Sequence, residues 1–192
     1  MMVENKIGFL SMLTPDMPAI SGSDGDKLPS PITALIDAHV HVFPKSVFRS
    51  IWQWFDTHAW PIRYRMGTSE LFDFLLGRGV DHIVALQYAH KPGIAVMLNQ
   101  YLAEKCRQYP GKVTGMATVM PGETGAVSIL EQAFDSGLGG VKLHTHVQCF
   151  NMISKAAYQV YECCAANRKP LVIHAGREPK SEAYQCDPYQ IC

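Results

Sequence analysis

Three polar side chains interrupt an apolar stretch early in the chain, and their types and spacing suit metal binding. Asp37, His39 and His41 alternate with apolar residues between Leu35 and Pro44. Successive side chains of a β-strand point to opposite faces, so these three would share one face of a strand. Two imidazoles on one face can offer ring nitrogens to a single divalent ion, and catalytic zinc sites commonly add a third protein ligand and a water. The pattern therefore predicts part of a metal site on this strand.

The position of the histidine pair favours a site over the alternative, in which both imidazoles are simply solvated or hydrogen-bonded. Pro44 stops the strand just after the pair. In α/β folds the carboxyl ends of strands carry the functional groups, so the pair stands where a ligand would bind.

Histidines also follow two later apolar strands. Lys142 and His144 lie on one face of the strand that begins at Gly140, as far as that strand runs, and His174 ends the strand that begins at Leu171. A single histidine after a strand is usually structural, but three strand ends with histidines indicate one shared site. Weaker candidates for the same site are His90, His146, Arg177 and Glu178, and His82 is expected to be structural.

The elements that must position these residues alternate along the chain. Hydrophobic periodicity predicts strands at residues 35–42, 80–86, 113–119, 140–143 and 171–174. It predicts helices at residues 46–58, 94–108, 124–135 and 156–166, and another that begins after Thr68 and stops at Gly77 or Gly79. Strands that alternate with helices at this spacing indicate an α/β chain with a parallel sheet of right-handed βαβ units.

Composition and charge narrow the class of function. The chain has 192 residues, with 17 Lys and Arg residues against 17 Asp and Glu residues, and no long block of like charge. This balance predicts no nucleic-acid partner and no membrane surface, and it favours a small-molecule substrate. No apolar stretch approaches the roughly 20 residues that cross a bilayer, and no persuasive signal peptide is present.

Residues 1–34 carry scattered Pro, Gly, Ser and Asp, which predicts a flexible leader, with residues 35–192 as one domain. The six cysteines include no C-x-x-C pair. We therefore expect reduced thiols in a cytoplasmic protein, with the adjacent Cys163 and Cys164 as packing residues on a helix.

Three motifs in order along the chain resemble the amidohydrolase superfamily, in particular its amidohydrolase-related branch of metal-dependent hydrolases with a TIM-barrel fold. They are IDAHVH at residues 36–41, GGVKLH at residues 139–144 and LVIHAG at residues 171–176. The resemblance covers residues 35–192. It implies a partial TIM (β/α)8 barrel of about five parallel strands with interleaved helices, since a complete barrel takes about 250 residues.

The resemblance also implies roles for the residues that match its motifs. His39, His41 and His174 would be metal ligands. Lys142 and His144 would contact substrate, and a carboxylated lysine that bridges two metals is the alternative used by some superfamily members. The divalent ion is expected to be zinc, with manganese and iron as alternatives that accept the same ligands. The catalytic histidine and aspartate of the family belong to later strands. We therefore assign no catalytic residue in the sequence up to Cys192, and the catalytic residues stay unknown.

Three functions follow as expectations from the resemblance. The first is hydrolysis of a small-molecule amide, ester or lactone bond through a metal-activated water. The second is metal-dependent decarboxylation of an aromatic or unsaturated carboxylic acid, and the third is a non-catalytic truncated remnant. Because five strands cannot close a barrel, we expect either a fragment of a longer protein or a homo-oligomer that pairs through exposed sheet edges.

Overall fold

The computed structural model describes residues 25–28, 32–174, 176–178 and 181–186. Most of the expected leader at residues 1–34 lies outside these ranges, so the leader stays a prediction. The side chains of Arg177 and Glu178 also lie outside the described set.

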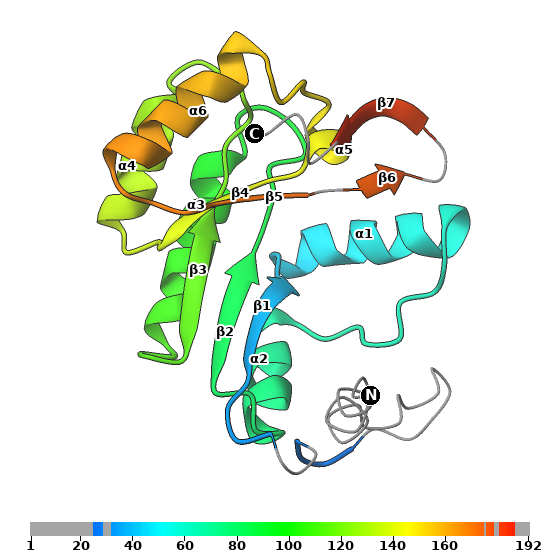
Figure 1. The fold of residues 1–192 in the computed structure, drawn as a ribbon. Helices are drawn as coiled ribbons and strands as arrows, with labels where there is room; N and C mark the ends of the chain where they lie inside the picture. The colour runs from blue at the N-terminus through cyan, green and yellow to red at the C-terminus, as the bar shows by residue number, and fades with distance from the viewer. Residues whose placement is uncertain (1–24, 29–31, 175, 179–180, 187–192) are drawn as a thin grey trace, which may run out of the picture.

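Five parallel strands form a sheet that curls into half of a barrel (Figure 1). They are β1 (Ile36–His41), β2 (His82–Leu86), β3 (Val113–Ala117), β4 (Gly140–Leu143) and β5 (Leu171–Ile173). The strands lie in chain order, and each pairs in parallel with the next. All five carboxyl ends therefore meet at one edge of the sheet. This confirms the predicted α/β chain in the form of a partial TIM barrel.

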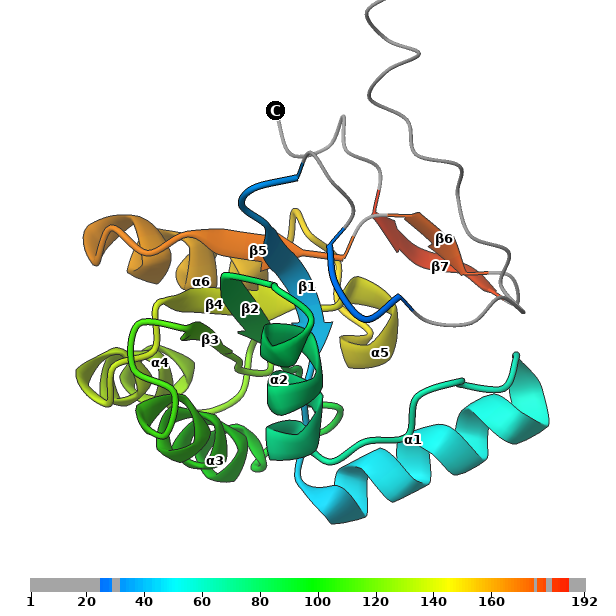
Figure 2. The same ribbon diagram turned by 90° about the horizontal axis from the view of Figure 1, so that it is seen from below.

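Helices connect the strands, and some of them cover one face of the sheet. They are α1 (Lys45–His58), α2 (Thr68–Gly77), α3 (Ala95–Arg107), α4 (Ala126–Asp135), α5 (Thr145–Gln148) and α6 (Lys155–Ala166). Figure 2 shows α2, α3, α4 and α6 around the outside of the curved sheet, whereas α1 extends away from it. Among the described helices, none combines the length and the apolar character of a membrane span.

Two features near the carboxyl end of the chain were not predicted. Helix α5 follows β4 directly, because His144 acts as its N-cap and its side chain accepts a hydrogen bond from the backbone N–H of Val147. Strands β6 (Gly176–Glu178) and β7 (Ser181–Cys186) form an antiparallel pair, and β7 contacts α5.

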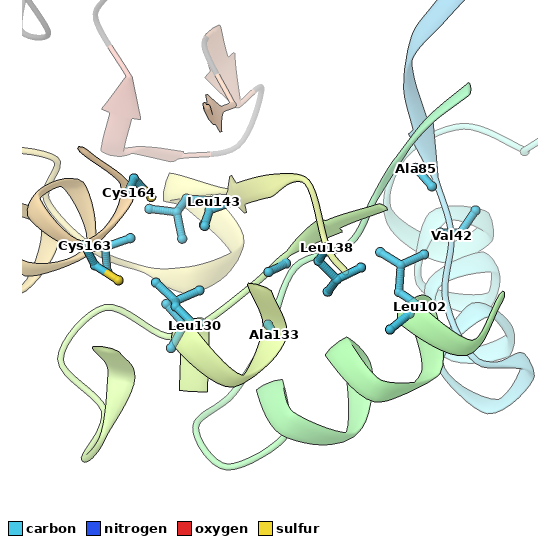
Figure 3. Close-up of a cluster of buried hydrophobic side chains, with 14 of the residues drawn as sticks. Val42, Ala85, Leu102, Leu130, Ala133, Leu138, Leu143, Cys163 and Cys164 are labelled. Carbon is cyan, nitrogen blue, oxygen red and sulfur yellow. The ribbon is translucent and has the colours of Figure 1, made fainter. Parts of the chain in front are cut away.

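The hydrophobic core lies between the sheet and its covering helices. Leu102, Leu130 and Leu143 are fully buried and belong to one cluster, part of which is shown in Figure 3. Full burial of one leucine side chain stabilises a fold by about 1.5–3 kcal/mol. Cys163 and Cys164 are buried in the same cluster as free thiols, which confirms that they pack on a helix.

The outer strand β1 is packed along only half of its length. The alternation predicted one apolar face along this strand, and Val40 and Val42 are indeed buried. Ile36 is 62% exposed, and Ala38 is exposed as well. β1 is the first strand of the sheet, and the described helices do not cover its amino-terminal half. The apolar face of this strand is therefore packed at Val40 and Val42 but not at Ile36 and Ala38.

Gly115 of β3 faces the core where there is no room for a methyl group. A Cβ atom at this position would lie 2.7 Å from Cys106 Sγ and 2.8 Å from Leu138 Cδ2. Gly115→Ala should therefore lower the free energy of unfolding by about 1–3 kcal/mol, the usual cost of overpacking. Urea denaturation measures this loss. Gly77→Ala is the matched control, since no atom lies within 4 Å of its Cβ position, and an equal loss in both variants would contradict the packing argument.

Candidate functional site

Five histidines gather at the carboxyl end of the sheet. We call them the histidine cluster, and they are His39, His41, His144, His146 and His174. Two come from β1, two from the segment after β4 and one from the residue after β5. The backbone N–H of His174 donates a 3.0 Å hydrogen bond to the carbonyl of Leu143, which extends the β4–β5 pairing as far as the cluster.

The two histidines of β1 point ring nitrogens at each other. The Nε2 atoms of His39 and His41 lie 3.0 Å apart, and their ring centroids are 4.9 Å apart. Two nitrogens that bind one zinc ion at about 2.1 Å each can be no more than about 4.2 Å apart. The pair is therefore compatible with one shared ion. Without an ion, a protonated Nε2 of one ring can donate a hydrogen bond to the other.

An irregularity in β1 includes the first histidine of this pair, because it lies between Asp37 and Val40. Three steps along β1, from Asp37 to Val40, are matched by two steps along β2, from Ile83 to Ala85. The extra residue makes a β-bulge, a feature that redirects side chains next to functional sites. Asp37 stabilises the bulge, because its Oδ1 accepts a 3.1 Å hydrogen bond from the backbone N–H of His39. The strict alternation predicted for this strand is therefore interrupted between Asp37 and Val40, at the position of His39.

The other three histidines form a second group. The rings of His144 and His174 stack with centroids 4.0 Å apart and planes 8° apart. His146 lies edge-on to both, at 6.3 Å from His144 and 5.8 Å from His174. The β4 strand ends before His146, which reaches the cluster from α5 instead.

Tyr88 lies between the two groups of histidines, two residues after β2. Its ring contacts His41 at a centroid distance of 5.4 Å and His144 at 4.9 Å, both in edge-to-face geometry. Tyr88 is not among the site residues predicted from the sequence. The available signal was an aromatic residue at the carboxyl end of a strand, the same position that the histidines occupy.

The structure brings the predicted ligands to one end of the sheet without completing a ligand set. His39 and His41 converge, and the charge of His174 is close enough to affect the pKa of His41. Across the described ranges, no three His, Cys, Asp or Glu side chains are grouped closely enough to hold a metal ion. The donor chemistry of the β1 pair fits a divalent ion, since zinc, manganese and iron all accept imidazole. The three-ligand assignment stays a prediction.

Lys142 introduces a positive charge beside these imidazoles. Its side chain is fully buried on β4. Burial is the largest cause that lowers the pKa of His39, His41 and His144, and the charge of Lys142 lowers all three further. The pKa falls to about 3 for His41 and for His144. These two imidazoles are therefore neutral at pH 7 and keep a lone pair for a ligand.

Two other histidines stand apart from the cluster. His82 contacts the carbonyl oxygen of Gly111 through Nδ1 at 3.2 Å and the hydroxyl of Thr114 through Nε2 at 2.8 Å. This confirms its structural role. His90 is exposed, and among the described rings it contacts no member of the cluster.

Comparisons with known proteins bear on the family and the fold. A family model described as amidohydrolase matches residues 36–191. No curated protein matches the chain. A solved structure of amidohydrolase II is 21% identical, with a TM-score of 0.60 over 77% of this chain and 53% of that chain.

Two further solved structures resemble the chain in fold. The 5-carboxyvanillate decarboxylase of Novosphingobium aromaticivorans, complexed with manganese and 4-hydroxy-3-methoxy-5-nitrobenzoic acid, is 18% identical, with a TM-score of 0.61 over 86% of this chain and 56% of that chain. A putative amidohydrolase from Staphylococcus aureus is 16% identical, with a TM-score of 0.57 over 77% of this chain and 49% of that chain. The chain spans about half the length of these solved structures.

The buried neutral imidazoles predict a loss of stability in acid. An unfolded histidine titrates near pH 6.5, whereas the pKa of His41 in the folded chain is about 3. Between these values the unfolded chain binds a proton that the folded chain does not. The contribution of His41 to the free energy of unfolding should therefore be fully present above pH 6.5, and it should be lost as the pH drops towards 3. At pH 5 the expected loss from one such histidine is about 2 kcal/mol.

Urea denaturation of the metal-free chain at several pH values between about 7.5 and 5 measures this slope. His41→Asn should reduce this slope by about half, because the variant lacks one of the two imidazoles whose pKa is lowered to about 3, and His144 remains. His58→Gln is the control, since His58 is exposed at the end of α1, and it should keep the slope of the unaltered chain. If the urea concentration at the midpoint of unfolding does not change between pH 7.5 and 5, the buried imidazoles do not resist protonation.

Proposed function

The chain belongs to the amidohydrolase family, and we propose that it forms the metal-binding part of an enzyme that acts on a carboxyl or acyl carbon of a small molecule. The observation that carries this proposal is the histidine pair of β1, whose Nε2 atoms lie 3.0 Å apart. The pair lies at the carboxyl end of a parallel sheet, which is where TIM-barrel enzymes place their active sites.

The residues that would hold the ion are His39 and His41, with His174 proposed as the third ligand. A divalent ion bound there would supply Lewis acidity and an activated water. Manganese is present in the similar decarboxylase structure, which supports manganese as a candidate beside zinc and iron. The low pKa of His41 favours binding, because a neutral imidazole needs to lose no proton before it ligates.

Lys142 and His144 are proposed to contact the substrate. The Lys142 ammonium is buried beside the imidazoles, so an anionic group such as a carboxylate would be attracted to it in a region of low dielectric constant. The neutral His144 ring can donate one hydrogen bond and accept another. A small molecule with a carboxylate or a polarised carbonyl group fits these two residues.

Two reactions fit this arrangement. Hydrolysis of an amide, ester or lactone bond is the first, and family membership supports it. Decarboxylation of an aromatic or unsaturated carboxylic acid is the second, and the likeness in fold to 5-carboxyvanillate decarboxylase favours it. Release of carbon dioxide, against release of a new carboxylic acid, separates the two reactions in an assay. A chain that binds metal and performs neither would be the non-catalytic remnant.

Metal analysis of the purified chain tests the ligand assignment. After dialysis against zinc or manganese, the unaltered chain should retain about one equivalent. The double variant with His39→Ala and His41→Ala should retain almost none, because both converging donors are gone. The matched control carries His58→Ala and His90→Ala, which remove two exposed histidines. Equal retention in the two double variants would show that the β1 pair does not hold the ion.

Association through the sheet edges is a separate proposal. β1 and β5 are the outer strands of the described sheet, and Ile36 on β1 is 62% exposed. Open strand edges of this kind pair with other chains. Ile36→Lys should therefore reduce self-association in sedimentation velocity, whereas Met97→Lys on α3, at a residue that is 46% exposed, should not. A chain that is monomeric at all concentrations would contradict this proposal.

A further inference from the structure

We propose that Tyr88 is a positioning residue, whose ring fixes the distance between the β1 histidine pair and the stacked rings of His144 and His174. The inference rests on the proposed function, because its purpose is to direct imidazoles from separate strands at one bound ion and its substrate.

The first support is the set of rings around Tyr88. It contacts His41 at 5.4 Å, Phe43 at 5.0 Å and His144 at 4.9 Å, with interplanar angles of 73°, 71° and 66°. Edge-to-face packing of this kind is a preferred arrangement of aromatic rings. Phe43 also lies parallel to the His41 ring, with planes 4° apart. His41 is therefore confined by Tyr88 and Phe43, and Tyr88 sets how closely His144 can approach it.

The second support is the backbone that carries Tyr88, which is held on both sides by buried hydrogen bonds. On one side Gln87 Nε2 donates to Asn99 Oδ1 at 3.2 Å, and on the other side the backbone N–H of Ala89 donates to Thr118 Oγ1 at 3.0 Å. Asn99 also binds both backbone groups of Thr118, at 2.9 and 2.8 Å. All four residues are buried.

This network ties the segment after β2 to α3 and to the end of β3. Because the Gln87 side chain points towards α3, the alternation of an extended chain sends the Tyr88 ring to the opposite side, towards the histidines. Functional groups are held accurately when the residues that support them are themselves fixed by packing and hydrogen bonds. Tyr88 has both kinds of support.

Cobalt(II) titration of the purified chain tests this role, because the visible spectrum of bound cobalt reports the geometry of its ligands. Tyr88→Phe keeps the ring and should keep both the affinity and the spectrum. Tyr88→Leu and Tyr88→Met remove the ring and should weaken cobalt binding by about tenfold or more, the usual effect of losing a residue that supports ligands. Both variants should also change the spectrum. Tyr158→Leu on α6 is the control, at a residue that is 51% exposed.

Urea denaturation establishes that each variant is folded, so that a change in the cobalt spectrum reports local geometry. If Tyr88→Leu and Tyr88→Met keep the affinity and spectrum of the unaltered chain, the spacing role is wrong. If Tyr88→Phe loses as much affinity as they do, the hydroxyl and not the ring is needed, which also overturns it.

Failure of the proposed function would look different, since the unaltered chain itself would then bind no cobalt. In that case the nitrogen NMR signals of the imidazoles in the metal-free chain decide the question for Tyr88. Signals of His41 and His144 that shift in Tyr88→Leu but not in Tyr88→Phe would support the spacing role. Unchanged signals in both variants would overturn it.

Discussion

Parallel pairing of five strands in chain order is the constraint on which the whole candidate site depends. Residues more than a hundred positions apart in the sequence become neighbours only because each strand ends at the same edge as the one before it. Backbone hydrogen bonds carry this alignment beyond the regular strands, from Val42 to Leu86 and from His174 to Leu143. A slip in either pairing would separate the two groups of histidines.

The same alignment concentrates polar groups in a place that excludes water. Lys142 is fully buried, and His41 and His144 each have a pKa near 3. Keeping such groups out of water costs free energy, and the apolar packing of the opposite face of the sheet must offset this cost. The buried leucines between the sheet and its helices provide that packing. The core and the site thus lie on opposite faces of the same sheet. Lys142 on β4 is flanked in the chain by the buried residues Val141 and Leu143.

Much of this arrangement could be predicted from the sequence, because its signals are local. Alternation and helical periodicity placed all five strands of the half-barrel, and the order of the motifs indicated the family. The bulge in β1 could not be found in this way, since it is defined by the pairing of Asp37 and Val40 with a partner strand. Helix α5 was missed because histidine is an unusual N-cap residue. Tyr88 was missed because its importance lies in ring contacts with residues from other strands.

The bulge at Asp37 makes the two β1 imidazoles unequal as bases. The negative charge of Asp37 raises the pKa of His39 and so opposes the effects of burial and Lys142 there, whereas no carboxylate among the described residues raises the pKa of His41. His39 is also the more exposed of the two rings. A ligand that arrives from solvent therefore meets the His39 ring first and the less exposed His41 ring second.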